Sequence, residues 1–227
     1  MWLFTLSATA ISGAFFVALI ASWNRRRSPQ LLAWAIALLM FSVASAAVLV
    51  GTSTRWTPGW FRTYYLFGAI TNVPVLALGT LYLLAPRRFA HSCSLLVSGA
   101  TLIAAVVTLR ADLAIAPLAT GGIPAGAEVV PDAIRLLSRI YSFAGSFVVL
   151  GGAVWSAVRV GGKDEPALRQ LLLANSLIAA GTFVVALGSV FARYGRGSVF
   201  AVALAAGVGL MFVGFLHTRP PAAQSLS

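Results

Sequence analysis

Seven long apolar runs dominate this sequence, and each is close to the length that a helix needs to cross a bilayer. A hydrocarbon core about 30 Å thick takes roughly 20 apolar residues per helix. The pattern predicts an all-α, polytopic membrane protein in which residues 1–227 form a single domain, a bundle of seven transmembrane helices. The predicted spans are residues 2–23, 31–51, 63–85, 93–110, 136–158, 170–192 and 198–217.

Charged residues are few and mostly basic. They make up 9% of the chain, with 16 Lys and Arg against 5 Asp and Glu, whereas soluble domains carry roughly 25%. The arginines are scattered in ones, twos and threes between the apolar runs, which is how a polytopic protein marks its loops. We therefore expect the lipid bilayer, and no nucleic acid, to be the partner of this basic chain.

The three arginines Arg25, Arg26 and Arg27 directly follow the first run. Basic residues beside the first helix usually fix the orientation of the whole chain, so we expect an N-terminus outside and a cytoplasmic C-terminus. This orientation places nine basic residues in cytoplasmic segments and seven in outer segments. No basic region precedes the first run, which indicates an uncleaved helix. The expected location is a plasma (inner) membrane of prokaryotic type.

Residues 111–135 form the one sizeable loop, on the outer side in this orientation. Its first half, 111–123, is apolar but too short to span, and it should lie on or dip into the outer leaflet; a re-entrant loop is the alternative. A helix is expected to restart at Asp132, because an acidic residue suits a first turn. Arg135 and Arg139, four residues apart, would then share a face.

A weak internal repeat relates the first and fifth runs. At an offset of 132 residues the identical pairs are Gly13/Gly145, Phe15/Phe147, Val17/Val149, Ala21/Ala153 and Trp23/Trp155. The third and seventh runs show no convincing match. The pairs predict two parallel three-helix units joined by the fourth helix, a 3+1+3 plan known from transporters.

That plan resembles the architecture of the sugar-transporting SWEET proteins and, more loosely, the microbial rhodopsins. SWEET-like proteins place a proline inside corresponding helices of each repeat, whereas here Pro74 has no partner in the seventh run. Rhodopsins need a lysine in the last helix for retinal, and the only lysine is Lys163, in a loop. The resemblance therefore implies a bundle architecture and no cofactor.

Catalytic chemistry finds little support in the sequence. All five acidic residues lie in loops or at an interface, and no ionisable residue falls near a predicted midplane, where proton relays and ion pathways need one. His91 and His217 have no second ligand three or four residues away, so no metal site is expected. Cys93 lacks an activating base at helical spacing. We predict that the protein is not an enzyme.

Polar residues near the predicted midplane are the candidate ligand contacts. Pro74 should kink the third helix and free backbone carbonyls one turn earlier. The residues around the kink and on the sixth helix can either hydrogen-bond between helices or line a small polar pocket. The candidates are Thr71, Asn72, Pro74, Asn175 and Ser176.

A second group of candidates lies at the outer end of the third helix. Arg55, Arg62, Tyr64 and Tyr65 could receive an anionic headgroup or a partner loop, or they could be an aromatic belt with snorkelling arginines. Six tryptophans, all near predicted helix ends, are interpreted first as belt residues. They are Trp2, Trp23, Trp34, Trp56, Trp60 and Trp155.

Three function classes follow from these patterns. The first is a carrier- or receptor-like protein that binds a small neutral or lipidic ligand inside the bundle, with a cavity touching Asn72 and the sixth helix. The second is a non-catalytic accessory or scaffold subunit that meets a membrane-protein partner and has a filled core. The third, a lipid-modifying membrane enzyme, would need converging catalytic groups, which the sequence does not show.

Overall fold

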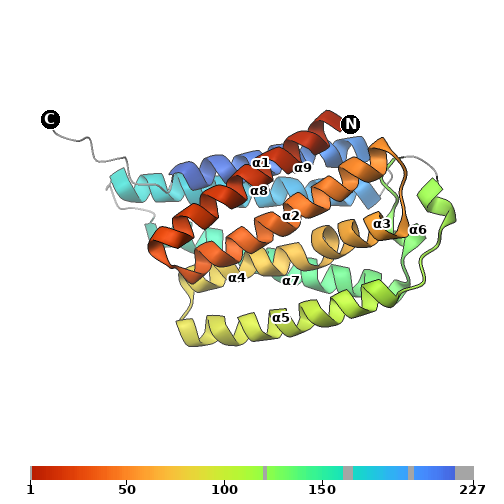
Figure 1. The fold of residues 1–227 in the computed structure, drawn as a ribbon. Coiled ribbons are helices and arrows are strands. Elements are labelled where there is room, and N and C mark those ends of the chain that lie inside the picture. Colours follow the sequence, from red (N-terminus) through yellow and green to blue (C-terminus); the bar gives the residue numbers. More distant parts are fainter. Residues whose placement is uncertain (1, 120–121, 161–165, 194–196, 218–227) are drawn as a thin grey trace.

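A computed structural model describes residues 2–119, 122–160, 166–193 and 197–217 (Figure 1). Every regular element in this part of the chain is helical, as the sequence predicts. The elements are α1 (Trp2–Arg26), α2 (Pro29–Ser53), α3 (Pro58–Tyr64), the π-helix η1 (Tyr65–Thr71), α4 (Asn72–Leu84), α5 (Arg87–Arg110), the 3₁₀ turn η2 (Ala116–Ala119), α6 (Gly126–Val129), α7 (Asp132–Val160), α8 (Pro166–Arg193) and α9 (Gly197–His217).

Six helical segments are long and apolar enough to cross a membrane, so the chain is a helical membrane protein. They are α1, α2, the continuous run α3–η1–α4, α5, most of α7, and α9. Within α8, the described apolar part covers only Ser176–Phe191. The seventh span and the orientation in the membrane therefore stay predictions.

Local signals place three helix starts earlier than the apolar runs do. The third span begins at Pro58, because the Thr57 hydroxyl accepts a hydrogen bond from the backbone N–H of Trp60 and so caps the helix. Proline also suits the first turn of a helix. Helix α5 begins at Arg87, directly after Pro86. Helix α7 begins at Asp132, the predicted restart.

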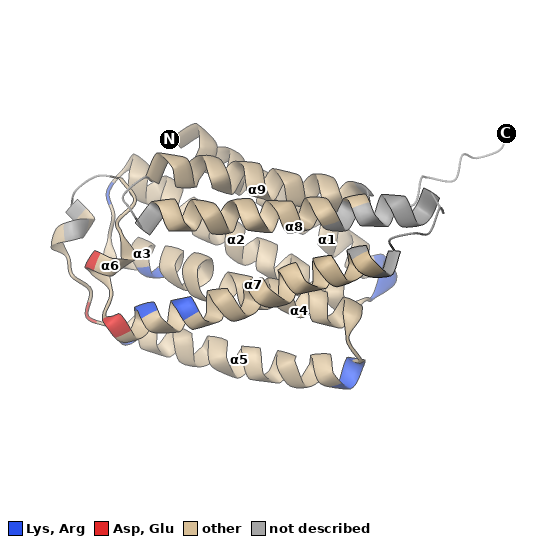
Figure 2. Ribbon diagram, turned by 180° about the vertical axis from the view of Figure 1, so that it is seen from behind, with Lys and Arg blue, Asp and Glu red and all other residues tan. Residues whose placement is uncertain are grey.

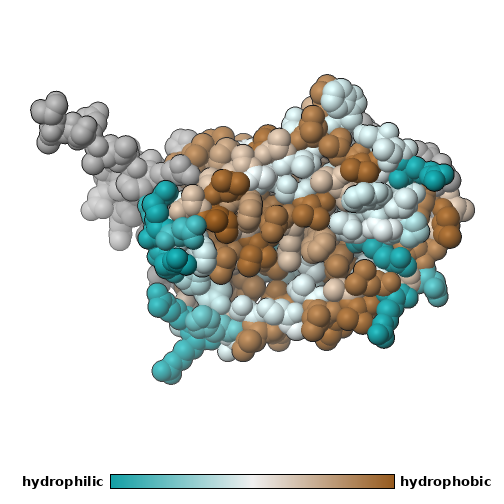
Figure 3. All heavy atoms as spheres, viewed as in Figure 1, coloured by the Kyte–Doolittle hydropathy of each residue, from teal (hydrophilic) through white to brown (hydrophobic). Residues whose placement is uncertain are grey.

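Six helices form a closed ring. Neighbours pack in the cyclic order α1, α2, α4, α7, α8, α9 and back to α1. Helix α5 lies outside this ring, against α4, η1 and α7, and Figure 1 shows it along one edge of the bundle. Most of its side chains face away from the protein. This leaves an apolar surface of the kind that lipid covers in a membrane (Figure 3).

Small residues bring α8 and α9 into the closest contact of the ring. A side chain at Gly181 would collide with the backbone of Gly207, and one at Gly188 would collide with Ala203. Close backbone approach through small residues is how helices associate in lipid, where burial of apolar surface gives no advantage. Gly181, Gly188, Ala203 and Gly207 thus serve the packing of α8 on α9.

The loop that follows α5 covers one end of the bundle. We call residues 111–119 and 122–131 the cap. Leu118, Val129 and Val130 of the cap are buried in an apolar cluster with the α3–η1 segment. Two hydrogen bonds tie the cap down: the Trp56 indole N–H donates to the Gly122 carbonyl, and Arg62 Nη2 donates to the Ala111 carbonyl over 2.8 Å.

The ring order is the order that two parallel three-helix repeats would give, with α1, α2 and α4 followed by α7, α8 and α9. The paired residues nevertheless lie in different surroundings. Phe15 is buried whereas Phe147 is 76% exposed, and Val17 is 63% exposed whereas Val149 is buried. The sequence identities therefore do not reflect equivalent packing positions.

Candidate functional site

A π-helical segment, η1, ends three residues before Pro74, where the sequence predicts a kink. Pro74 has no N–H to donate to a carbonyl of the preceding turn. Two serines of α7 donate to a carbonyl within η1: Ser138 Oγ donates to the Ala69 carbonyl over 2.8 Å, and Ser142 Oγ donates to it over 3.1 Å. This carbonyl thus joins the third span to α7.

Glycine lets the two helices meet at this point. A Cβ on Gly145 of α7 would lie 2.9 Å from the Pro74 nitrogen and from the Val73 carbonyl carbon. These are backbone atoms, which cannot move aside as a flexible side chain can. The α7 backbone therefore rests directly on the kink.

The two polar residues beside Pro74 are engaged within the protein. Asn72 Nδ2 donates to the Ala37 carbonyl of α2 over 2.8 Å, and Thr71 Oγ1 donates to the Leu66 carbonyl over 2.9 Å. Both side chains are buried. Of the two roles that the sequence leaves open for Asn72, the structure shows the hydrogen bond between helices, which uses one of the two N–H groups of the side-chain amide.

The structure does not gather the five midplane candidates into one site. Thr71, Asn72 and Pro74 lie together at the junction of η1 and α4. Ser176 is exposed on α8, and the side chain of Asn175 lies outside the described residues.

The candidates at the start of the third span pack beneath or beside the cap and do not form an open surface, with the exception of Arg55. Tyr65 is buried and stacks on Phe61, with ring centroids 5.6 Å apart. Tyr64 packs edge-on against Phe61, and Arg62 is held by the cap as described above. Arg55 stands apart and is exposed. Three of the four predicted contacts thus lie together, beneath or beside the loop.

Open space occurs at the other end of the bundle, in a crevice between α4, α7 and α8. Its walls are Thr80, Leu83 and Leu84 of α4, part of α7 from Val149 to Ser156, and Ile178 and Ala179 of α8; Trp34 of α2 closes its inner side. Its cavity volume, measured as the space open to the centre of a water-sized sphere, is about 30 Å³. Among the lining side chains only Trp34, Thr80 and Ser156 carry a polar atom.

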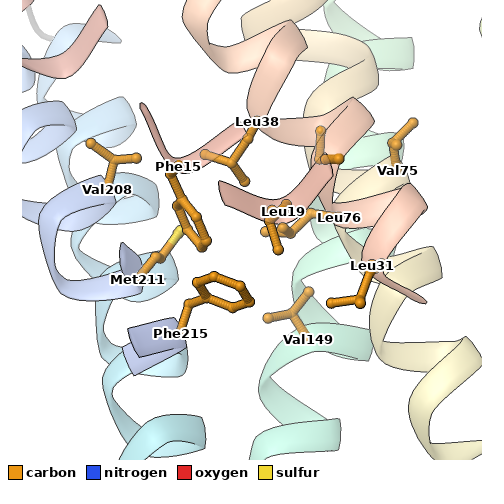
Figure 4. Close-up of a cluster of buried hydrophobic side chains, with 13 residues drawn as sticks. Phe15, Leu19, Leu31, Leu38, Val75, Leu76, Val149, Val208, Met211 and Phe215 are labelled. Carbon is orange, nitrogen blue, oxygen red and sulfur yellow. The ribbon is translucent and has the colours of Figure 1, made fainter. Parts of the chain in front are cut away.

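A smaller pocket of about 20 Å³ lies within the ring and shares Trp34 and Ile178 with the crevice. It is lined by the facing side chains of Phe15, Leu38, Leu76, Met211 and Phe215, all of which Figure 4 shows. The crevice and the central pocket are thus two spaces next to the same tryptophan, one reaching the wall of the bundle and the other its axis.

Trp34 is the residue of this site that the sequence did not reveal. The indole lies against Gly79 of α4, where any side chain would collide with it. In sequence Trp34 is five residues from the start of α2 and resembles a belt tryptophan, like the exposed Trp2 and Trp155. The signal for an inward position is the pairing of the large Trp34 side chain with Gly79 on another helix. The sequence alone does not show that these two residues face each other.

The end of the bundle that holds the crevice is strongly basic. Arg25, Arg26 and Arg27 in the α1–α2 turn, and Arg87 and Arg88 at the start of α5, are exposed there. The guanidinium of Arg27 lies 4.7 Å from the Trp23 ring centroid. Figure 2 shows the acidic residues of the described chain at the opposite end, and Figure 3 shows the hydrophilic patch of the basic end. We call these five arginines the basic end.

Comparison of the chain with family models, with curated proteins and with solved structures finds no match in any of the three. In the described residues no group of three or more His, Cys, Asp or Glu side chains could hold a metal ion. The crevice and its surroundings are therefore the candidate functional site.

Proposed function

We propose that the protein is a carrier- or receptor-like membrane protein that binds a lipidic ligand in the crevice between α4, α7 and α8. The observation that carries this proposal is the crevice itself: a mostly apolar space between α4, α7 and α8, next to the partly buried indole of Trp34. Ligand sites are typically concave and apolar, with a few polar groups that fix orientation. The site differs from the Asn72 region, which is occupied by contacts between helices.

The size of the crevice indicates how a ligand would enter. Its volume of about 30 Å³ holds only water-sized groups. An acyl chain would therefore have to displace the rim residues Leu83 and Leu84, which are 45% and 37% exposed and face the lipid. Entry from the bilayer through a wall of movable leucines suits a lipidic ligand better than a polar solute from water.

The proposal includes seven spans and the orientation expected from the arginines. Helix α8 has 28 residues, which gives a length of about 42 Å at a rise of 1.5 Å per residue. That length is sufficient to cross a hydrocarbon core about 30 Å thick. With seven crossings and the basic end in the cytoplasm, the crevice opens toward the inner leaflet.

The test is photocrosslinking of the full-length protein in vesicles containing phosphatidylcholine with a diazirine in its acyl chain. We expect labelled peptides from α4, α7 and α8 around the crevice. Ala179→Leu, which places a larger side chain in the crevice, should lose most of this labelling. Ala180→Leu is the matched control, because Ala180 is the next residue of α8 and is exposed outside the crevice.

Asn72→Leu separates this site from the one predicted at the kink. It should weaken the fold by about 0.6 kcal/mol, the average for a hydrogen bond between membrane helices, and leave the crevice labelling unchanged. Equal labelling of the wild type and Ala179→Leu would overturn the crevice proposal. Loss of labelling in a folded Asn72→Leu protein would move the site to the kink.

An accessory or scaffold subunit is the second candidate function. The filled packing around Asn72 and Pro74 favours it, because a scaffold needs no cavity at the midplane. It predicts that the purified protein retains a membrane-protein partner in mild detergent. Under this alternative the crevice would take up no lipid beyond random contact, so the same crosslinking experiment distinguishes the two functions.

A further inference from the structure

We infer that the crevice and the arginines beside it form one site for an anionic phospholipid, with an acyl chain in the crevice and the headgroup at Arg87 and Arg88. This inference rests on the proposed function and names its ligand class. It follows from the juxtaposition of an apolar slot, lined in part by the last residues of α4, and two exposed positive charges at the start of the next helix, α5.

The connection between slot and charges is short. Leu84 lines the crevice and is the last residue of α4, and α5 begins three residues later at Arg87. Leu84 also faces α7, since a side chain at Gly152 would touch its Cδ1 atom. A chain that lies along Leu84 therefore ends close to the turn that carries Arg87 and Arg88.

The crevice has the shape of a chain segment rather than of a compact ligand. Its α7 wall runs from Val149 to Ser156, a length of about 10 Å along the helix axis at 1.5 Å per residue. Gly152 and Ala153 form the middle of this wall, and their small size leaves room beside the helix. Such a slot takes the upper part of one acyl chain, the part nearest the headgroup.

Charge selects the headgroup. All five arginines of the basic end are exposed, and the acidic residues in the described part of the chain, Asp112, Glu128 and Asp132, are at the far end (Figure 2). No described carboxylate therefore neutralises Arg87 or Arg88. Guanidinium groups bind phosphate oxygens in paired hydrogen bonds, and basic sites between transmembrane helices on the cytoplasmic side bind anionic headgroups. A zwitterionic headgroup would gain less from the same arginines.

The experiment compares two headgroups on the same crosslinking chain. Full-length protein is placed in phosphatidylcholine vesicles with a trace of diazirine-acyl phosphatidylglycerol or diazirine-acyl phosphatidylcholine. We expect phosphatidylglycerol to label the crevice more strongly, on the order of tenfold at low salt, and the preference to shrink as salt rises.

Charge-matched variants locate the headgroup. The double variant Arg87→Gln/Arg88→Gln should abolish the preference for phosphatidylglycerol and keep the labelling by phosphatidylcholine. Arg55→Gln/Arg139→Gln removes two exposed arginines from the opposite end, so the net charge falls equally, and the preference should persist.

Each other outcome has a separate meaning. Equal labelling by both lipids, still blocked by Ala179→Leu, would overturn the anionic headgroup and leave the crevice proposal standing. A preference that both double variants weaken equally would overturn the assignment to Arg87 and Arg88, because net charge alone would then explain it. Labelling that Ala179→Leu leaves unchanged for both lipids would remove the proposed function together with this inference.

Discussion

At the scale of single residues, glycine decides where the helices of this bundle meet. Gly79 provides the surface for the Trp34 indole, and Gly145 provides the surface for the Pro74 kink. In both places the partner is rigid, an aromatic ring or a backbone. Tight contacts of this kind are sensitive to the addition of a single methyl group.

Gly145→Ala should therefore destabilise the protein by about 1–3 kcal/mol, the usual cost of overpacking. The added Cβ would lie 2.9 Å from two backbone atoms of the third span, which must shift. The measurement is the unfolding midpoint of purified protein in detergent.

Gly151→Ala in the same helix is the control, because no atom lies within 4 Å of its added Cβ. It should be neutral or slightly stabilising, since alanine favours the helix over glycine by up to about 1 kcal/mol. Equal midpoints for the two variants would show that α7 does not rest on the kink.

At the scale of elements, the third span shows how one proline changes a whole helix. The π-helix η1 precedes Pro74, and the Ala69 carbonyl within it accepts hydrogen bonds from two serines of α7. This segment is thus also a joint between helices. Proline alone predicts a freed carbonyl one turn earlier, whereas the partners of the Ala69 carbonyl depend on the packing of α7.

The shared carbonyl makes a specific prediction about Ser138 and Ser142. Either Ser138→Ala or Ser142→Ala should cost little, because the other hydroxyl still donates to the Ala69 carbonyl. The double variant leaves a carbonyl unpaired between two helices and should cost about 1–3 kcal/mol. Unfolding of all four proteins in detergent gives the coupling energy directly. Strictly additive costs would contradict a shared acceptor.

The cap illustrates the limit of element prediction. The sequence predicts a loop at 111–135 that lies on or in the outer leaflet, because its first half is apolar and too short to span. In the structure Leu118 of that first half, together with Val129 and Val130 of the second half, covers the aromatic end of the third span. Apolarity in a membrane protein does not distinguish contact with lipid from contact with protein.

At the scale of the whole molecule, orientation follows from the ends of the bundle. The five arginines of the basic end lie at the α1–α2 and α4–α5 turns, and the cap lies at the opposite end of the bundle (Figure 1, Figure 2). If the positive-inside rule governs this chain, the turn with Asn24 faces the cytoplasm and the turn with Thr54 faces outside.

Cysteine labelling in intact cells tests this orientation. In a Cys93→Ala background, which removes the single native cysteine, Thr54→Cys should react with a membrane-impermeant maleimide. Asn24→Cys should react only after the cells are permeabilised. Both positions are exposed in the structure, so a reversed pattern would mean that the N-terminus is cytoplasmic.

The sequence by itself determined that this is an all-helical membrane protein and where most of its helices lie. Apolar length, proline and glycine act locally, so these features can be read along the chain. Only the tertiary structure decided that Trp34 turns inward, that Asn72 is bonded to Ala37, and that the crevice lies beside Arg87 and Arg88. Those features depend on which face of each helix meets which neighbour. In a uniformly apolar helix the sequence carries little amphipathic pattern to specify that face, and close packing decides it.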